Sequence, residues 1–85
     1  MSAMWYVYMI KCSDGSLYTG VTTDIERRMN EHNSGKGASY TRVRTPVRLV
    51  HHESRPDRSK ALKREAEIKR WPRSKKLTLI KKDHD

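Results

Sequence analysis

The sequence predicts one small α+β domain covering residues 1–85, because of its length, a β-hairpin near its start and helical periodicity after it. A chain of 85 residues has room for one hydrophobic core and no second one. The expected order is two strands, a helix, a third strand, a second helix and a short terminal helix. We expect the structured part to run from about residue 4 to about residue 80.

Two strands are expected first. Trp5–Lys11 is rich in aromatic and branched residues, which is typical of a strand, and Ser16–Val21 predicts the second. Cys12 is the single cysteine, so it forms no internal disulfide and no zinc site alone. We expect it to be a small buried hydrophobic residue.

The turn between these strands decides where two tyrosines point. A two-residue Asp-Gly turn would put Tyr8 and Tyr18 on opposite faces. A three-residue loop with Gly15 left-handed would instead pair Ile10 with Tyr18 and Tyr8 with Gly20. Both phenols would then share one face, and the functional interpretation below depends on this second geometry.

The first helix is predicted by a capping-box pattern, with Thr23 at the N-cap and Glu26 three residues later. It should run to about Asn33 and stop near Gly35. Four residues at helical spacing share one face of it: Ile25, Arg28, Met29 and His32.

A basic, glycine-containing loop is expected at Ser34–Thr45, and Pro46 then precedes the third strand, Val47–Glu53. The loop offers Lys36, Arg42 and backbone amides to a phosphate. It lacks the spacing of a P-loop, so nucleotide hydrolysis is not indicated.

The second helix should open at Pro56 and Asp57 and reach about Trp71, where Pro72 ends it. Its apolar stripe consists of Ala61, Leu62 and Ile68.

A short terminal helix is expected after Pro72, with Ser74 as its cap. Leu77 and Ile80 should pack back on the core, and the tail Lys81–Asp85 should be frayed.

The net charge of +9 favours a phosphate-rich partner, because Lys and Arg displace condensed counterions from nucleic acid. Ordinary solubility is the alternative explanation. No stretch has the features of a signal peptide or the length of a membrane span, so we expect a cytoplasmic protein.

Glu65 is a carboxylate on the apolar stripe of the second helix. Burying a carboxylate without a partner is costly, so it should be paired, protonated or bound to a metal. A salt bridge to one of the many basic residues is as good an explanation as a catalytic role.

Four further side chains could carry chemistry. Arg28 could be aimed at a phosphate, and His32, one helical turn later, could relay a proton. The alternatives are an arginine with a solvent-exposed head and a structural histidine. Tyr8 and Tyr18 could act as bases if a metal or a cation lowered the pKa of the phenol, or they could simply pack across the hairpin.

Together these positions resemble the GIY-YIG nuclease superfamily, most closely its small stand-alone bacterial branch. Tyr6–Tyr8 stands where the first signature triplet falls, and Tyr18–Gly20 stands where the second falls. The family's essential arginine lies eight residues after the motif glycine, which selects Arg28 over Arg27. The helix of residues 61–69 is similar to the one that carries the family's metal-binding glutamate.

The sequence departs from the family pattern at several positions. Tyr6 and Thr19 replace the Gly and Ile of the signature, and Val21 stands where some members have a lysine. A late asparagine used by several members has no counterpart, since the chain has Asn30 and Asn33 alone.

The resemblance implies a three-stranded antiparallel sheet flanked by helices and a one-metal phosphodiester hydrolysis. Glu65 would hold Mg²⁺ or Mn²⁺. Tyr8 would position or help deprotonate the attacking water, and Tyr18 would share or take over that role. Arg28 would stabilise the charge on the scissile phosphate, with support from His32.

We therefore expect a metal-dependent endonuclease that cleaves DNA rather than RNA with low sequence specificity, as a monomer, although a dimer is possible. One alternative is a nucleic-acid-binding module or adaptor in DNA repair that has little or no activity. Another is a protein-interaction domain with an acidic partner. The basic residues expected to contact nucleic acid are Arg27, Lys36, Arg42, Arg44 and Lys69.

Overall fold

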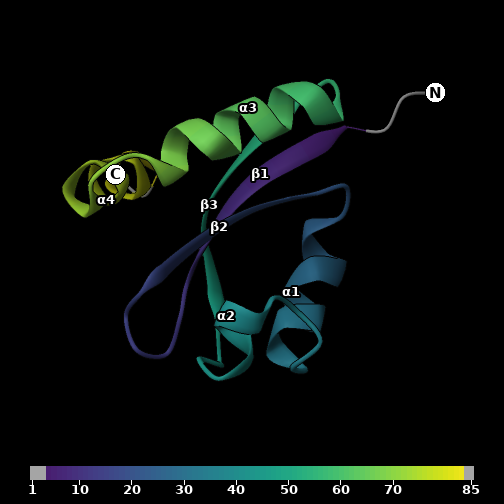
Figure 1. The fold of residues 1–85 in the computed structure, drawn as a ribbon, viewed down its shortest axis with the longest axis vertical. Helices are drawn as coiled ribbons and strands as arrows, with labels where there is room; N and C mark the ends of the chain where they lie inside the picture. Colours follow the sequence, from purple (N-terminus) through teal and green to yellow (C-terminus); the bar gives the residue numbers. More distant parts are fainter. Residues whose placement is uncertain (1–3, 84–85) are drawn as a thin grey trace.

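The computed structural model describes residues 4–83 and shows a three-stranded antiparallel sheet in the order β2-β1-β3 (Figure 1). The expected α+β fold is therefore confirmed. The strands are β1 (Trp5–Lys11), β2 (Leu17–Thr22) and β3 (Arg48–Arg55).

Helices cover both faces of this sheet. In Figure 1, α1 and α2 lie on one side of the strands, and α3 with α4 lies on the other. No helix among residues 4–83 has the length and apolar character needed to cross a membrane. The helices are α1 (Ile25–Asn33), α2 (Ser39–Arg42), α3 (Arg58–Lys69) and α4 (Arg73–Asp83).

The hairpin has the three-residue loop, with Gly15 at φ 85°. The backbone amide of Gly15 donates to the carbonyl oxygen of Cys12 at 2.9 Å, and the amide of Cys12 donates to the carbonyl oxygen of Ser16 at 2.9 Å. Ile10 therefore pairs with Tyr18. β2 begins one residue later than expected because Ser16 closes the loop.

The start of α1 differs from the prediction. Asp24, not Thr23, is the N-cap, and its carboxylate accepts a hydrogen bond from the backbone amide of Arg27 at 3.0 Å. A carboxylate at this position accepts from a backbone amide that has no partner inside the helix. Its negative charge also interacts favourably with the positive end of the helix dipole. The helix ends at Asn33 as expected, and Gly35 follows with φ 81°.

The segment Ser34–Thr45 is not a simple loop, because it contains the short helix α2. The third strand then starts at Arg48 instead of Val47 and continues past Glu53 to Arg55. Val47 exchanges two hydrogen bonds with the side-chain amide of Asn33, at 2.7 and 3.1 Å, and so does not join the sheet ladder.

The second helix begins as predicted, since the carboxylate of Asp57 accepts from the amide of Lys60 at 2.9 Å. It ends at Lys69, two residues before the predicted end at Trp71. Its Ala61 and Ile68 are buried, while Leu62 is half-buried.

The terminal helix is longer than predicted. α4 starts at Arg73, so Ser74 lies inside it and is not its cap. Ile80 packs on the core as predicted, together with Leu79, but the prediction for Leu77 is wrong, because that side chain is exposed. The helix continues to residue 83, and residues 84–85 of the tail that we expected to fray lie outside the described residues.

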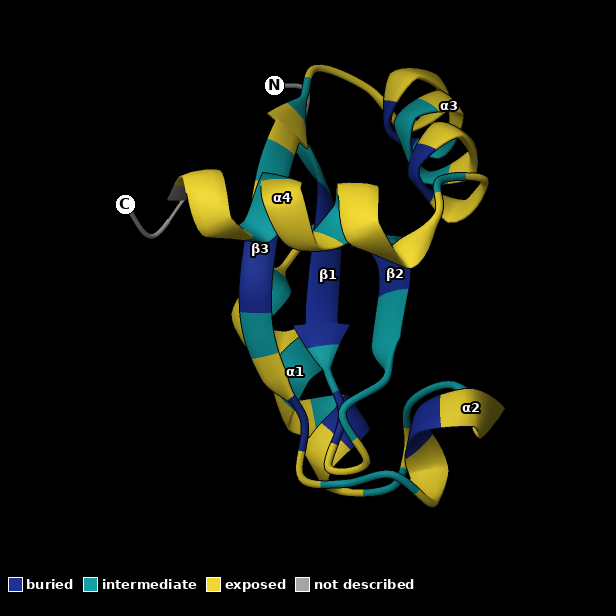
Figure 2. Ribbon diagram, turned by 90° about the vertical axis from the view of Figure 1, so that its left-hand side faces the viewer, coloured by how far each residue is buried: buried dark blue, intermediate teal, exposed yellow. Residues whose placement is uncertain are grey.

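Alternate residues of β1 supply two separate cores, one on each face of the sheet. Figure 2 shows the middle of β1 buried and the outer surfaces of the helices exposed. On the α3–α4 face the buried cluster is Val7, Met9, Val50, Ala61 and Ile68. On the α1–α2 face it is Tyr8, Ile10, Cys12 and Val47, so the expected burial of Cys12 is confirmed.

A charged network that the sequence analysis did not predict joins β3 to α3. The carboxylate of Glu53 accepts from His51 at 2.7 Å, from Arg55 at 2.7 Å and from Arg64 at 2.8 and 3.1 Å. Burial opposes ionisation of Glu53, but the hydrogen bonds from Arg64 and His51 outweigh it and lower its pKa to about 2. The network therefore holds α3 against β3 through the ionised carboxylate of Glu53. Because this carboxylate is partly buried, it needs the hydrogen bonds of its partners.

Replacing Glu53 with Gln should lower the free energy of unfolding by about 1–2 kcal/mol, and Tm by about 5–10 °C, since the cluster keeps some contact with solvent. The pKa of Glu53 falls from 4.5 to about 2 on folding, so its contribution is complete above pH 4.5. It should disappear as the pH falls towards 2. Thermal unfolding followed by circular dichroism between pH 2 and 7 measures both effects.

Glu67→Gln is the matched control, because Glu67 also contacts Arg64 but is exposed. It should change the free energy of unfolding by less than about 0.5 kcal/mol. Equal losses in the two variants would show that the position of Glu53 between β3 and α3 has no special importance.

Candidate active site

Tyr8 lies at the centre of the sheet face that α1 covers, with 1% of its surface exposed. Its ring packs over Gly20 of β2, its partner in the sheet. A Cβ atom at Gly20 would come within 2.5 Å of the Tyr8 hydroxyl oxygen. Glycine at this position therefore makes room for the phenol.

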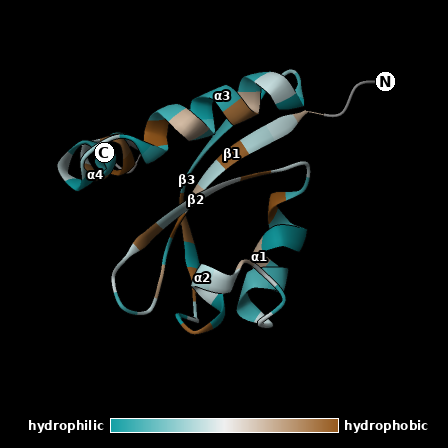
Figure 3. Ribbon diagram, viewed as in Figure 1, coloured by the Kyte–Doolittle hydropathy of each residue, from teal (hydrophilic) through white to brown (hydrophobic). Residues whose placement is uncertain are grey.

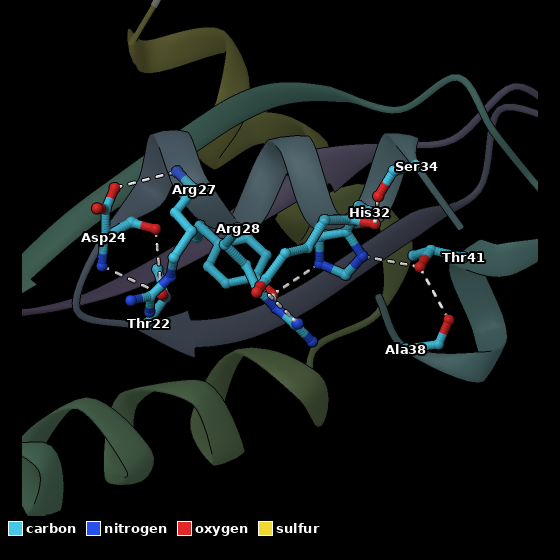
Figure 4. A network of polar contacts seen from close by, with 10 residues as sticks. Thr22, Asp24, Arg27, Arg28, His32, Ser34, Ala38 and Thr41 are labelled. Atoms are coloured by element: carbon cyan, nitrogen blue, oxygen red, sulfur yellow. Dashed lines mark hydrogen bonds and ion pairs between the residues drawn. The ribbon is translucent and has the colours of Figure 1, made fainter. Parts of the chain in front are cut away.

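The Tyr8 hydroxyl is held by two side chains of α1. His32 Nε2 lies 2.9 Å from the hydroxyl oxygen, and Arg28 Nε donates to the same oxygen at 3.3 Å. Arg28 and His32 are one helical turn apart, so α1 presents them on its inner face as predicted. Figure 4 shows both side chains pointing from α1 towards this centre. The structure thus unites three of the predicted catalytic residues.

Histidine is an unusual core residue for this helix, which is mostly hydrophilic in Figure 3. His32 is fully buried, and its second ring nitrogen, Nδ1, lies 2.8 Å from the hydroxyl oxygen of Thr41 in α2. A Cβ atom at Gly37 would lie 2.2 Å from the same nitrogen. Sequence reasoning missed Thr41 and Gly37, because only folding brings the loop against the ring.

Burial shifts the two titrating groups of this centre in opposite directions. Burial raises the pKa of Tyr8, although the hydrogen bond from Arg28 acts against it. Burial lowers the pKa of His32, and the charge of Arg28 lowers it further. At neutral pH the centre therefore holds a phenol beside an uncharged imidazole, which is able to receive a proton.

Arg28 is oriented by its own helix. Its guanidinium Nη1 lies 3.1 Å from the carboxylate of Glu31, and about a quarter of the side chain is exposed. Its neighbour Arg27 is exposed on the outer side of α1. Arg28 therefore faces both the buried phenol and solvent, which suits a group that meets a substrate at the surface.

Tyr18 stands beside the centre and begins a row of stacked groups. Its ring centroid lies 5.6 Å from that of His32 and 6.0 Å from that of Tyr40. The guanidinium of Arg44 lies 4.0 Å from the Tyr40 centroid, and the ammonium of Lys69 lies 5.9 Å from that of Tyr18. Two of the predicted nucleic-acid contacts thus flank the tyrosines, and Tyr40 was not predicted.

Glu65 reaches the same region from α3, which packs against β1 and the edge strand β2. About 19% of its side chain is exposed, and it lies 3.5 Å from Lys69 Nζ, so it is paired as one alternative anticipated. Its negative charge also contributes to the raised pKa of Tyr8, which places it within electrostatic range of the phenol.

The carboxylates and imidazoles of this region limit how a divalent metal ion could be held. Residues 4–83 contain no group of three or more His, Cys, Asp or Glu side chains that could hold a metal. Mg²⁺ and Mn²⁺ do not require such a group, because waters and substrate phosphates complete the shell around one or two carboxylates. Glu65 fits that minimal requirement, and its lysine partner is exposed and long enough to move aside.

The other three predicted nucleic-acid contacts are exposed residues of α1, the following loop and α2. Arg27 and Lys36 line a shared hollow on the outer side of α1, and Arg42 is exposed in α2. The structure therefore brings Arg44 and Lys69 to the tyrosines but leaves Arg27, Lys36 and Arg42 as peripheral charges.

This combination of a hairpin with two tyrosines, a helix with Arg and His, and a carboxylate on a later helix defines a class of catalytic domain. Residues 4–78 match the family described as the GIY-YIG catalytic domain, and the chain belongs to that family. A UPF0213 protein of Haloquadratum walsbyi is 58% identical over 85 residues, which cover all of this chain and 96% of that protein. A UPF0213 protein of Staphylococcus aureus is 58% identical over 76 residues, 89% of this chain and 93% of that protein.

Two solution structures share the fold. A UPF0213 protein of Bacillus halodurans has a TM-score of 0.60 at 49% identity, covering 92% of this chain and 83% of that one. A protein of E. faecalis has a TM-score of 0.63 at 46% identity, covering 95% of this chain and 86% of that one. Membership of the GIY-YIG family therefore places this chain in a nuclease superfamily. The names of these relatives specify no activity.

Proposed function

We propose that this protein is a metal-dependent endonuclease that hydrolyses phosphodiester bonds in DNA with low sequence specificity. The observation that carries the proposal is the hydrogen-bonded series Arg28–Tyr8–His32, with Glu65 within electrostatic range of the phenol. A packing role alone would not require a buried phenol to contact both a guanidinium and a neutral imidazole.

Tyr8 is the proposed base, acting together with His32. A phenol with a raised pKa cannot accept a proton while it keeps its own. As water attacks phosphorus, its proton passes to the Tyr8 oxygen, and the Tyr8 proton passes to His32 Nε2. The neutral imidazole is suited to receive it, and the 2.9 Å separation allows direct transfer.

Arg28 is proposed to serve two purposes. Its Nε–H donates to the Tyr8 oxygen and would stabilise negative charge that develops there. The exposed part of the guanidinium can reach a substrate phosphate oxygen and stabilise the charge of the transition state. Tyr18, next to His32, is proposed to share the contact with the attacking water or the phosphate.

Glu65 is the proposed ligand for Mg²⁺ or Mn²⁺. When bound, the ion supplies Lewis-acid stabilisation of the leaving oxygen. If Glu65 left its ion pair with Lys69 to bind the metal ion, the Lys69 ammonium would be free to contact a phosphate. Glu65 would thereby couple arrival of the cation to exposure of a substrate contact on α3.

The positive charge supports a nucleic-acid substrate. The chain carries a net charge of +9, and Arg44 and Lys69 lie at the two ends of the stacked tyrosines. Cations in such positions can follow a phosphate backbone past the site without reading bases. Low sequence specificity is the expected consequence.

Arg28→Ala should lower kcat by about 10²–10³-fold, because it removes a donor to the transition state. Arg27→Ala is the matched control from the same helical turn. It should weaken DNA binding while changing kcat little, since Arg27 lies on the outer side of α1. Single-turnover cleavage at saturating protein separates the two effects, and equal kcat values in both variants would remove Arg28 from the mechanism.

The experiment that tests the proposed function is cleavage of labelled single-stranded, duplex and branched DNA, and of RNA, with Mg²⁺, Mn²⁺ or chelator. Metal-dependent cuts in DNA support the proposal. Tight binding without any cut would favour a binding module. Binding that is absent, or that lacks the steep negative salt dependence of phosphate contacts, would favour a protein-interaction domain.

A further inference from the structure

Thr41 is fully buried, and both hydrogen-bonding partners of its hydroxyl lie nearby (Figure 4). The oxygen lies 2.8 Å from His32 Nδ1 and 3.0 Å from the backbone carbonyl oxygen of Ala38. The Thr41 hydroxyl donates to this carbonyl, which can only accept and which also receives the backbone amides of Thr41 and Arg42. The hydroxyl oxygen is then free to accept a hydrogen bond from His32 Nδ1–H.

The other end of the imidazole leads to the same assignment. Tyr8 receives a hydrogen bond from Arg28 and has a hydroxyl proton to donate. In the described part of the chain, the acceptor within reach of that proton is His32 Nε2. If Nε2 carried a proton instead, the Tyr8 oxygen would face two donors and its own proton would have no partner.

A neutral imidazole carries one proton, so these two ends determine one tautomer. Nδ1 is protonated and donates to Thr41, while Nε2 is unprotonated and accepts from Tyr8. The charged and titratable groups facing the ring from the surrounding elements are Tyr8, Tyr18, Arg28 and Glu31. The Arg28 charge and burial keep the ring neutral, but neither selects which nitrogen carries the proton.

We propose that Thr41 is a positioning residue whose hydroxyl holds His32 in the Nδ1–H tautomer, so that Nε2 can take the proton of Tyr8. This inference rests on the proposed function for its consequence in catalysis. Gly37 contributes by letting the loop backbone close over the ring, where, within residues 4–83, Thr41 is the hydrogen-bond partner of Nδ1. Such an orienting group acts through the histidine and never touches the substrate.

The test is the tautomer itself, measured by long-range ¹H–¹⁵N correlation spectra of the full chain with ¹⁵N-labelled histidines. The His32 signals are identified by their loss in His32→Gln. Wild type should show Nδ1 protonated and Nε2 unprotonated. Wild type with a protonated Nε2 would overturn the proposal without any variant, and this readout does not depend on cleavage.

Two variants separate the hydroxyl from the shape of the side chain. Thr41→Val keeps the shape but removes the acceptor, so the spectrum should shift towards the Nε2–H tautomer, and kcat should fall about 10²-fold with KM unchanged. Thr41→Ser keeps the hydroxyl and should retain the wild-type tautomer and most of the activity. An unchanged Nδ1–H tautomer in Thr41→Val would overturn the proposal.

The two proposals fail in different ways. If wild type cleaves nothing but shows the expected tautomers, the role of Thr41 in setting the ring stands and the nuclease proposal falls. If wild type cleaves DNA and Thr41→Val matches it in tautomer and kcat, the nuclease proposal stands and Thr41 has no positioning role.

Discussion

Replacing Tyr8 with Phe should reduce DNA cleavage by at least about 10³-fold while leaving the fold intact. The substitution removes one oxygen atom, which accepts from Arg28 at 3.3 Å and contacts His32 Nε2 at 2.9 Å. Without it, water has no route for its proton to the imidazole. The ring continues to fill the space over Gly20, so the packing of β1 and β2 should persist.

The loss should appear in kcat rather than in DNA affinity, because the buried hydroxyl makes no contact with distant parts of the substrate. Single-turnover rates and fluorescence-anisotropy binding measure the two quantities. Tyr6→Phe is the matched control, since Tyr6 points to the same sheet face two residues earlier, and it should cleave normally. Cleavage by Tyr8→Phe within about tenfold of wild type would show that Tyr8 is not the base.

Glu65→Gln should abolish metal-dependent cleavage, lowering the rate by at least about 10³-fold, because an amide is a poor ligand for a hard divalent cation. DNA binding should persist or tighten, since Lys69 loses its ion-pair partner at 3.5 Å and becomes available to phosphate. Binding of Mn²⁺ should weaken in parallel, as measured by isothermal titration calorimetry.

Glu67→Gln provides the control for this experiment. Glu67 lies on the same helix two residues later, but it is exposed and contacts Arg64 instead. Normal cleavage and Mn²⁺ binding are expected in this variant. If Glu65→Gln cleaved as fast as Glu67→Gln at low metal concentration, Glu65 would not be the metal ligand.

Local chemistry made much of the fold predictable. Neighbours in the chain determine three of its features. These are the alternating side-chain directions of β1, the left-handed conformation of Gly15 and the end of α1 near Gly35. The same holds for the paired placement of Arg28 and His32, because residues four apart share a helix face. The wrong predictions at Thr23 and Ser74 were also local. Thr23 and Asp24 are adjacent polar residues that can both cap α1, and Asp24 does so. α4 begins at Arg73, one residue before the predicted cap Ser74.

The environment of the candidate site could not be predicted in this way. Thr41 and Gly37 reach His32 from the segment after α1, and Tyr40 of the same segment stacks on Tyr18 while Arg44 lies over Tyr40. Nothing in the spacing of these residues signals contact, because loop geometry depends on the surface it packs against.

The sequence was therefore sufficient for the α+β class and for placing Arg28 and His32 on one helix face, since periodicity acts over a few residues. It left the hairpin register open between two turns, and the structure decided it. Tertiary packing determined the protonation state and partners of those residues. The residues of this centre come from three different elements: Tyr8 from β1, Arg28 and His32 from α1, and Thr41 from α2. Their shared electrostatic environment exists only after β1, β2, α1 and α2 enclose one small, water-poor space.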